Sequence, residues 1–187
     1  MILKELIRQS NLKVNDAVTD DYWVDRFNEA LADLAPVLLL EGVKSTQLEV
    51  ITPVALPRDV LNDRIIMCRL GANLPRVALD DFDTTGYKIF DNSIDLQGRF
   101  SLPDTLTIWY QRTPKSLSLD DMEAEPEIPE PYQHALKYYA VAKWWQTELE
   151  PDFESSYWRD YVDIKQQLAY YINKKSRRYT DLTLRTR

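Results

Sequence analysis

The chain has 187 residues, 44% of them hydrophobic and 28% charged, which is enough apolar material for a buried core and excludes disorder along the whole length. This length fits one domain of ordinary size with room for a terminal arm. The net charge of −7 is unevenly spread: residues 174–187 hold six bases and one acid, so they carry +5 and residues 1–173 carry −12. An acidic body repels nucleic acid, so we expect no non-specific DNA binding.

Neither a targeting segment nor a membrane partner is expected. Residues 1–6 contain no long apolar run and no small-residue cleavage site, both of which a signal peptide needs. Crossing a bilayer takes roughly 20 apolar residues, and the longest run, residues 37–40, has four. We therefore expect a protein that is made and used in a cytoplasm.

Two helices are predicted near the N-terminus. Apolar residues at three- and four-residue steps predict a short amphipathic helix over residues 2–9. A second helix is predicted over residues 19–35, because Thr19 is a residue type favoured at the N-cap. We expect this helix to end before Pro36, since proline disfavours helical geometry in the residue that precedes it.

In residues 46–110 the pattern changes from helical to β-like, with β-like segments separated by prolines. The clearest signal predicts a β-hairpin, in which the alternating segments 87–90 and 94–96 flank the turn-forming triplet 91–93. A further strand is predicted over residues 106–110.

Two longer helices follow a loop that is rich in acids and prolines. The first is predicted over residues 131–149, where a wide apolar face indicates a central helix. The second is predicted over residues 153–174, where apolar residues recur at steps of three and four. Beyond Ser176 this periodicity stops, so residues 176–187 are expected to form an extended basic arm.

Together these elements predict an α+β fold. It would be mainly a helical bundle with a small antiparallel β insertion and an extended C-terminal arm. Residues 1–175 would form one domain, and residues 176–187 the arm.

Residues that could carry catalysis are few. Four scattered glycines form neither a dinucleotide fingerprint nor a phosphate loop, and no serine lies in a nucleophile elbow. The single histidine, His134, excludes a two-histidine metal motif, and we interpret it as a packed or interfacial residue. The single cysteine, Cys68, lies in an apolar stretch and is interpreted as an inert core thiol. We expect no catalytic residue, no cofactor and no metal ion.

Carboxylates are plentiful, and two stretches invite a different interpretation. Residues 81–86 resemble the start of a calcium loop, but the twelfth position is Asn92, where a bidentate glutamate is required. A loop leading into the hairpin is the better explanation. The acidic run over residues 120–130 is interpreted as solvated. Paired acids for glycoside cleavage stay open as an alternative, because the fold sets their spacing.

Aromatic residues are abundant, with 5 Trp, 11 Tyr and 5 Phe. Several stand in adjacent pairs on predicted helices, so one ring can fill the core while its neighbour faces another surface. Tyr and Trp are favoured at the centres of protein interfaces, although a large aromatic core explains the pattern equally well. The candidate subunit-interface residues are Tyr138, Trp144, Trp158 and Tyr170.

The order and spacing of several degenerate segments cover most of residues 19–172. They are Asp21-Tyr22-Trp23, Tyr87-x-Ile89-x-x-Asn92-x-Ile94-x-Leu96, Leu106-x-Ile108-x-Tyr110-x-x-x-Pro114, and Ile128-Pro129-Glu130-x-Tyr132-x-x-Ala135-Leu136. This ordered pattern resembles the head-to-tail connector adaptors of tailed bacteriophages.

The resemblance implies a structural virion protein of the neck, assembled in the host cytoplasm. It implies a homo-oligomeric ring, of twelve copies, that binds below the portal protein and contacts a tail or neck protein on its other side. Genomic DNA would pass through the ring without specific binding. Two alternatives stay open: another neck or tail-completion protein, and a carboxylate-dependent cell-wall hydrolase, for which the sequence offers no residue match.

In the family that the chain resembles, the C-terminal segment reaches up to the portal. A basic segment that becomes ordered on binding suits this task. The matching residues here are Lys174, Lys175, Arg177, Arg178, Tyr179, Leu182, Leu184, Arg185 and Arg187.

Overall fold

The structure, a computed structural model, describes the backbone of residues 1–14 and 18–184, and side chains as far as residue 175. The chain divides into two compact units. We call Met1–Leu39 together with Pro114–Arg187 the helical unit, and Leu40–Thr113 the β unit. The β unit is therefore inserted between the second and third helices of the helical unit.

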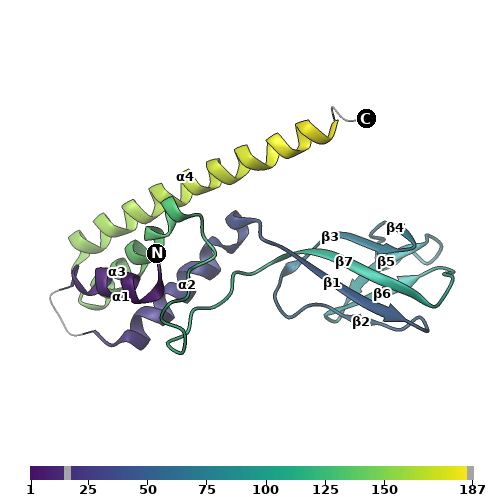
Figure 1. Cartoon of the computed structure of the whole chain (residues 1–187), viewed down its shortest axis with the longest axis horizontal. Coiled ribbons are helices and arrows are strands. Elements are labelled where there is room, and N and C mark those ends of the chain that lie inside the picture. The colour runs from purple at the N-terminus through teal and green to yellow at the C-terminus, as the bar shows by residue number, and fades with distance from the viewer. Residues whose placement is uncertain (15–17, 185–187) are drawn as a thin grey trace. The chain divides into compact units, whose positions relative to one another are not determined.

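The helical unit is built from helices that pack against one another (Figure 1). Its core includes Leu6, Trp23, Phe27, Leu136 and Leu168, none of which is exposed by more than a trace. The elements are α1 (Leu3–Asn11), α2 (Asp20–Leu38), the short 3-10 helix η1 (Glu130–Tyr132), α3 (His134–Thr147) and α4 (Pro151–Leu184).

Helix α2 begins as its sequence predicts and ends later. The Thr19 hydroxyl accepts a hydrogen bond from the Tyr22 backbone N–H at 3.4 Å, which makes Thr19 the N-cap. The helix continues through Pro36 to Leu38, so the predicted end at residue 35 is wrong. Pro36 lies in the last turn, where it removes one backbone hydrogen bond, and the burial of Leu38 offsets that loss.

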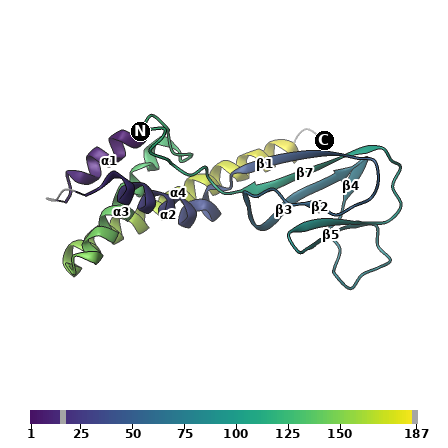
Figure 2. The same cartoon turned by 90° about the horizontal axis from the view of Figure 1, so that it is seen from below.

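The β unit consists of two antiparallel sheets. The first has the strand order β1-β7-β3-β4, and the second has the order β2-β6-β5. Figure 2 shows both sheets from below. The strands are β1 (Glu41–Leu48), β2 (Val54–Ala55), β3 (Val60–Leu70), β4 (Ala72–Leu74), β5 (Gly86–Phe90), β6 (Ser93–Gln97) and β7 (Asp104–Arg112).

A core of its own holds the β unit together. Cys68, Leu106 and Ile108 from the four-stranded sheet and Ile94 from the three-stranded sheet are fully buried in one cluster. The expectation of a mainly helical bundle with a small β insertion is therefore wrong. The fold is mixed, with the β segments forming a compact unit around this core.

The predicted β-hairpin is formed by β5 and β6, with a shorter turn than the sequence suggested. Asp91 and Asn92 both have positive φ angles, of 45° and 55°, as the two central residues of a type I′ hairpin turn require. Ser93 was predicted as a turn residue but pairs with Phe90 as the first residue of β6.

Helix α4 is longer than predicted, and the extended C-terminal arm is wrong for residues 176–184. The helix runs to Leu184, well beyond the last predicted residue, 174. No glycine or proline lies between residues 152 and 187, so nothing in the backbone ends the helix where its apolar stripe ends. Residues 185–187 lie outside the described part of the chain.

Candidate functional surfaces

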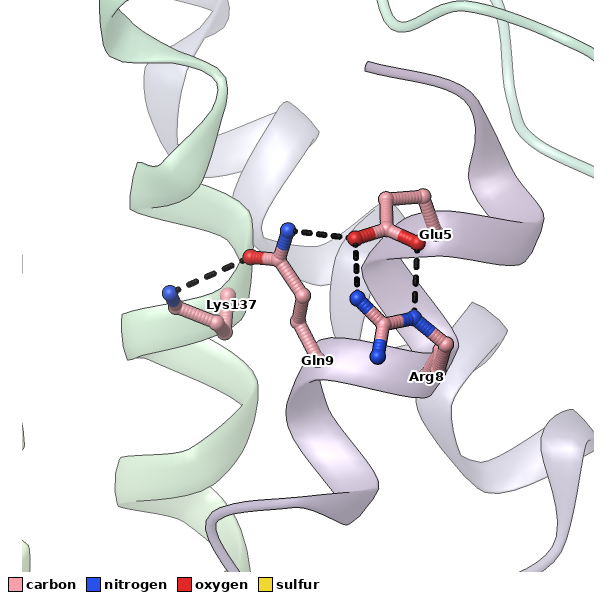
Figure 3. A network of polar contacts seen from close by, with 4 residues as sticks. All are labelled: Glu5, Arg8, Gln9 and Lys137. Carbon is pink, nitrogen blue, oxygen red and sulfur yellow. Dashed lines mark hydrogen bonds and ion pairs between the residues drawn. The ribbon is translucent and has the colours of Figure 1, made fainter.

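A polar network fixes the N-terminal helix to α3 (Figure 3). The Glu5 carboxylate accepts two hydrogen bonds from Arg8, at 2.7 and 2.8 Å, and one from Gln9 Nε2 at 2.8 Å. The hydrogen bond from Arg8 is the main reason that the pKa of Glu5 falls to about 2. Gln9 in turn accepts from Lys137 Nζ at 3.3 Å, which links α1 to α3. These polar groups, of which Arg8 is exposed and the other three are partly buried, position α1 against α3.

A second polar cluster joins α2 to α4. Asp33 accepts hydrogen bonds from the Tyr161 hydroxyl and from Lys165 Nζ, the latter at 2.7 Å. Partial burial alone would raise the pKa of Asp33, but the hydrogen bonds from Lys165 and Tyr161 outweigh it and lower the pKa. Burial and the neighbouring Asp33 raise the pKa of Tyr161, which therefore remains a protonated hydrogen-bond donor at neutral pH.

Two of the four candidate interface residues pack inside the helical unit. The Tyr138 ring is half-buried and lies 6.2 Å from the ring of Tyr157. The Trp144 ring is also half-buried and lies 5.5 Å from the Tyr22 ring, nearly perpendicular to it. Both rings therefore have intramolecular partners, and part of each side chain stays exposed.

The other two candidates are exposed on α4. Trp158 is 41% exposed and Tyr170 is 69% exposed. Tyr170 also borders a shallow groove of about 440 Å³, which is lined by Tyr132, Asp163 and neighbouring glutamines. The Trp158 ring also packs against Tyr139 and Tyr161, at 5.7 and 5.5 Å between ring centres, so Tyr170 is the more accessible of the two.

The basic C-terminal segment is described only in part. Lys174 and Lys175 are exposed, and Lys174 Nζ lies 5.9 Å from the centre of the Tyr170 ring. The other proposed portal-binding residues have side chains outside the described part of the chain: Arg177, Arg178, Tyr179, Leu182, Leu184, Arg185 and Arg187.

The outer face of the four-stranded sheet carries a row of apolar residues. In the strand register, Trp109 at the centre pairs with Val43 of β1 on one side and Met67 of β3 on the other. Val43 is 57% exposed, and the Trp109 and Met67 side chains are half-buried. This row was not predicted from the sequence, although the alternation around Trp109 in residues 106–110 indicates an outward-facing side chain.

The outer face of the three-stranded sheet carries a second apolar patch. Phe90 on β5 and Phe82 in the preceding loop are 62% and 79% exposed. They border a hollow of about 600 Å³ whose lining includes Lys88, Asp95 and Gln97. Lys88 Nζ donates a hydrogen bond to the Leu79 carbonyl at 3.0 Å and lies 4.3 Å from the Phe82 ring centre, so it fixes the loop over the sheet.

The stretch that resembles a calcium loop closes on itself. The Asp81 carboxylate accepts backbone hydrogen bonds from Asp83 and Thr84, both at 3.0 Å. These bonds, with a side-chain hydrogen bond from Thr84 as the largest cause, lower the pKa of Asp81. Asp81 is therefore engaged in shaping its own loop. Within residues 1–14 and 18–184, no three His, Cys, Asp or Glu side chains gather as a metal site would require.

The single cysteine and the single histidine both have burial-shifted pKa values. Burial raises the pKa of the Cys68 thiol to about 11, so the thiol stays protonated at neutral pH. Burial also lowers the pKa of His134, whose ring lies 5.7 Å from the Tyr138 ring. Of the helices that the structure describes, none combines the length and the apolar character needed to cross a membrane.

Comparison with known proteins identifies the family of the chain. A model of the SU10 adaptor protein family matches residues 1–187. The chain belongs to this family. Membership confirms the resemblance to phage adaptors and makes the chain a structural adaptor protein of a phage, in a family that is not a family of enzymes. A comparison with curated proteins finds no significant match.

Proposed function

We propose that the adaptor assembles as a ring, of twelve copies, below the portal and connects the capsid to the tail. One side of the ring binds the portal protein, and the other binds a tail or neck protein. The observation that carries the proposal is the family match over the entire chain. The ring therefore belongs to the virion neck, where genomic DNA passes through its channel.

The surfaces of both units support an assembly role. Each β unit exposes apolar residues on its two outer faces, and α4 exposes Trp158 and Tyr170. Exposed aromatic residues are a common feature of the centres of protein interfaces. A ring requires each copy to use two different surfaces, one for each neighbour, and these faces provide a choice of such surfaces.

Charge supports the passage of DNA without specific binding. Residues 1–173 carry −12, whereas residues 174–187 carry +5. A channel wall formed by the acidic part of the chain repels the phosphate backbone and lets DNA slide. The basic end then serves for attachment to the portal.

Co-sedimentation of purified adaptor with the portal protein of the same phage tests the proposed attachment. We expect the adaptor to move with the portal as one discrete complex. An adaptor that stays at the top of the gradient, at concentrations where both proteins are folded, would overturn the proposed portal attachment. An adaptor that binds only a later neck or tail component would favour the neck-completion alternative.

A further inference from the structure

The two sheets of the β unit face each other through a shared core, so their outer faces point in opposite directions. Ile94 on β6 and Ile108 on β7 are fully buried in that core. Side chains alternate along a strand, so the neighbours of these residues point outward. Asp95 and Trp109 therefore lie on opposite outer faces of the same unit.

The outer face of the four-stranded sheet, which we call the basic face, has an apolar centre. The row of Val43, Trp109 and Met67 crosses three neighbouring strands. The next row is polar. Within it the Ser45 and Thr107 hydroxyls are hydrogen-bonded to each other at 3.3 Å. An aromatic centre with a polar rim is the usual composition of an interface.

Two arginines give this face its charge. Arg64 donates a hydrogen bond to Gln111 Oε1 at 3.1 Å, which holds its guanidinium against the outer side of β7. Arg69 is exposed and pairs in register with Thr107. Glu41, which pairs in register with Gln111 on the edge strand β1, adds one negative charge to the same face. The face therefore has an excess of positive charge.

The outer face of the three-stranded sheet, which we call the acidic face, is also apolar at its centre. Leu79, Phe82 and Phe90 are each more than half exposed around the hollow described above. Asp80 and Asp83 are exposed beside Phe82 in the same loop. Lys88 is the base in the lining, and it is already engaged with the Leu79 carbonyl.

Two polar atoms in the hollow lack partners. Asp95 Oδ1 and Gln97 Nε2 are buried without a hydrogen bond to any of the described residues. A buried acceptor and a buried donor of this kind are costly to leave unpaired. Their position on the floor of an exposed apolar patch indicates a surface that is completed by another chain.

We propose that the basic face of one copy docks on the acidic face of the next copy. The inference rests on the proposed ring and assigns the surfaces that join its subunits. The charges of the two faces are complementary, which favours this pairing over contacts between two like faces. Arginine side chains of the basic face supply donors for the unpaired Asp95 carboxylate. Because the two faces point in opposite directions, each copy binds one neighbour through each face, as a heterologous ring requires.

Cysteine crosslinking of the full chain tests this pairing. The variant Val43→Cys/Phe82→Cys places one exposed thiol on each face, while the native Cys68 is buried. With a short bifunctional maleimide we expect a ladder of crosslinked oligomers. On a denaturing gel each single variant alone should run as uncrosslinked chains, and an equal mixture of the two single variants should give crosslinked dimers only.

A matched control places the second thiol away from the acidic face. Ile51 is 42% exposed and lies between β1 and β2, so Val43→Cys/Ile51→Cys should give no ladder. Circular dichroism checks that each variant folds. If Val43→Cys disturbs β1, the pair Ser45→Cys and Leu79→Cys samples the same two faces.

The outcomes separate this inference from the proposed function. A ladder from the double variant supports the pairing. If the double variant co-sediments with the portal but yields only uncrosslinked chains, the face pairing is overturned and the portal attachment stands. Dimers from Val43→Cys alone would indicate a symmetric contact and would also overturn it. If neither a ladder nor co-sedimentation is seen, both proposals fail.

Discussion

Several polar side chains in this protein join neighbouring helices or strands. Asp33 shows this well, because one carboxylate on α2 accepts from both Tyr161 and Lys165 on α4. Tyr161 is 1% exposed, and its hydroxyl donates to Asp33, whose own side chain is 43% exposed. The cluster therefore matters through the buried hydroxyl more than through the exposed ion pair.

Replacing Asp33 should destabilise the helical unit. In Asp33→Ala the Tyr161 hydroxyl loses its hydrogen bond to a charged acceptor, which costs about 1.5–3 kcal/mol of unfolding free energy. Urea denaturation measures the loss. Asp25→Ala, on an exposed position of the same helix, is the matched control and should change the stability by less than about 0.5 kcal/mol.

The effect should also depend on pH. Because the pKa of Asp33 is lowered in the folded protein, its stabilising contribution is fully present above the pKa of an unfolded aspartate. That contribution is lost as the pH falls through the lowered pKa. The stability difference between wild type and Asp33→Ala should thus narrow in acid. A difference that widens below pH 4 would contradict this assignment.

Gly42 is required by a close approach within the β unit. A Cβ atom at this position would lie 2.5 Å from Cζ of Tyr110, whose hydroxyl donates to Asp59 at 3.0 Å. Gly42→Ala should therefore displace the ring and lower the unfolding free energy by about 1–3 kcal/mol. Thermal denaturation measures this, with Ser45→Ala on the same strand as the control. Equal melting temperatures for the two variants would show that the Tyr110 ring moves freely.

Helices of this protein are predicted more easily from the sequence than its edge strands. Tyr161, Ile164 and Leu168 on α4 recur at three- and four-residue steps and are all buried, so their periodicity reports their packing. In β1 only Leu48, the last residue, is buried. An edge strand with one buried residue has almost no apolar alternation, and this is why residues 41–47 were not predicted as a strand.

Adjacent aromatic residues were ambiguous for a different reason. A pair such as Trp144 and Trp145 places two rings on diverging faces, and the sequence does not indicate which face meets the core. The structure packs Trp144 against Tyr22 and stacks Trp145 on Phe153, at 4.9 Å between ring centres. Both rings have partners within the helical unit, and only tertiary structure could reveal this.

The end of α4 is the element whose function is most easily tested. Deletion of residues 180–187 removes the last helical residues and two of the six bases of the C-terminal segment. We expect weaker co-sedimentation with the portal and an unchanged melting temperature, because the buried residues of α4 end at Leu168 within the described side chains. Full portal binding by the truncated protein would exclude this segment as the attachment point.

At the scale of the whole molecule, the charge pattern is more informative than the net charge. Residues 40–113 hold ten acids and eight bases, a near balance that conceals one acidic and one basic outer face. The sequence could not reveal this separation, because the faces come from alternating residues on several strands. The resemblance to connector adaptors rests on the order and spacing of the segments. This order indicates the family even though each segment alone is degenerate.

Electron microscopy of the portal with bound adaptor shows directly whether the adaptor joins the capsid to the tail. We expect a second ring of density, coaxial with the portal, when the full-length adaptor is present. Scattered particles of free adaptor beside bare portals, or density attached off the axis, would contradict an adaptor that joins the capsid to the tail.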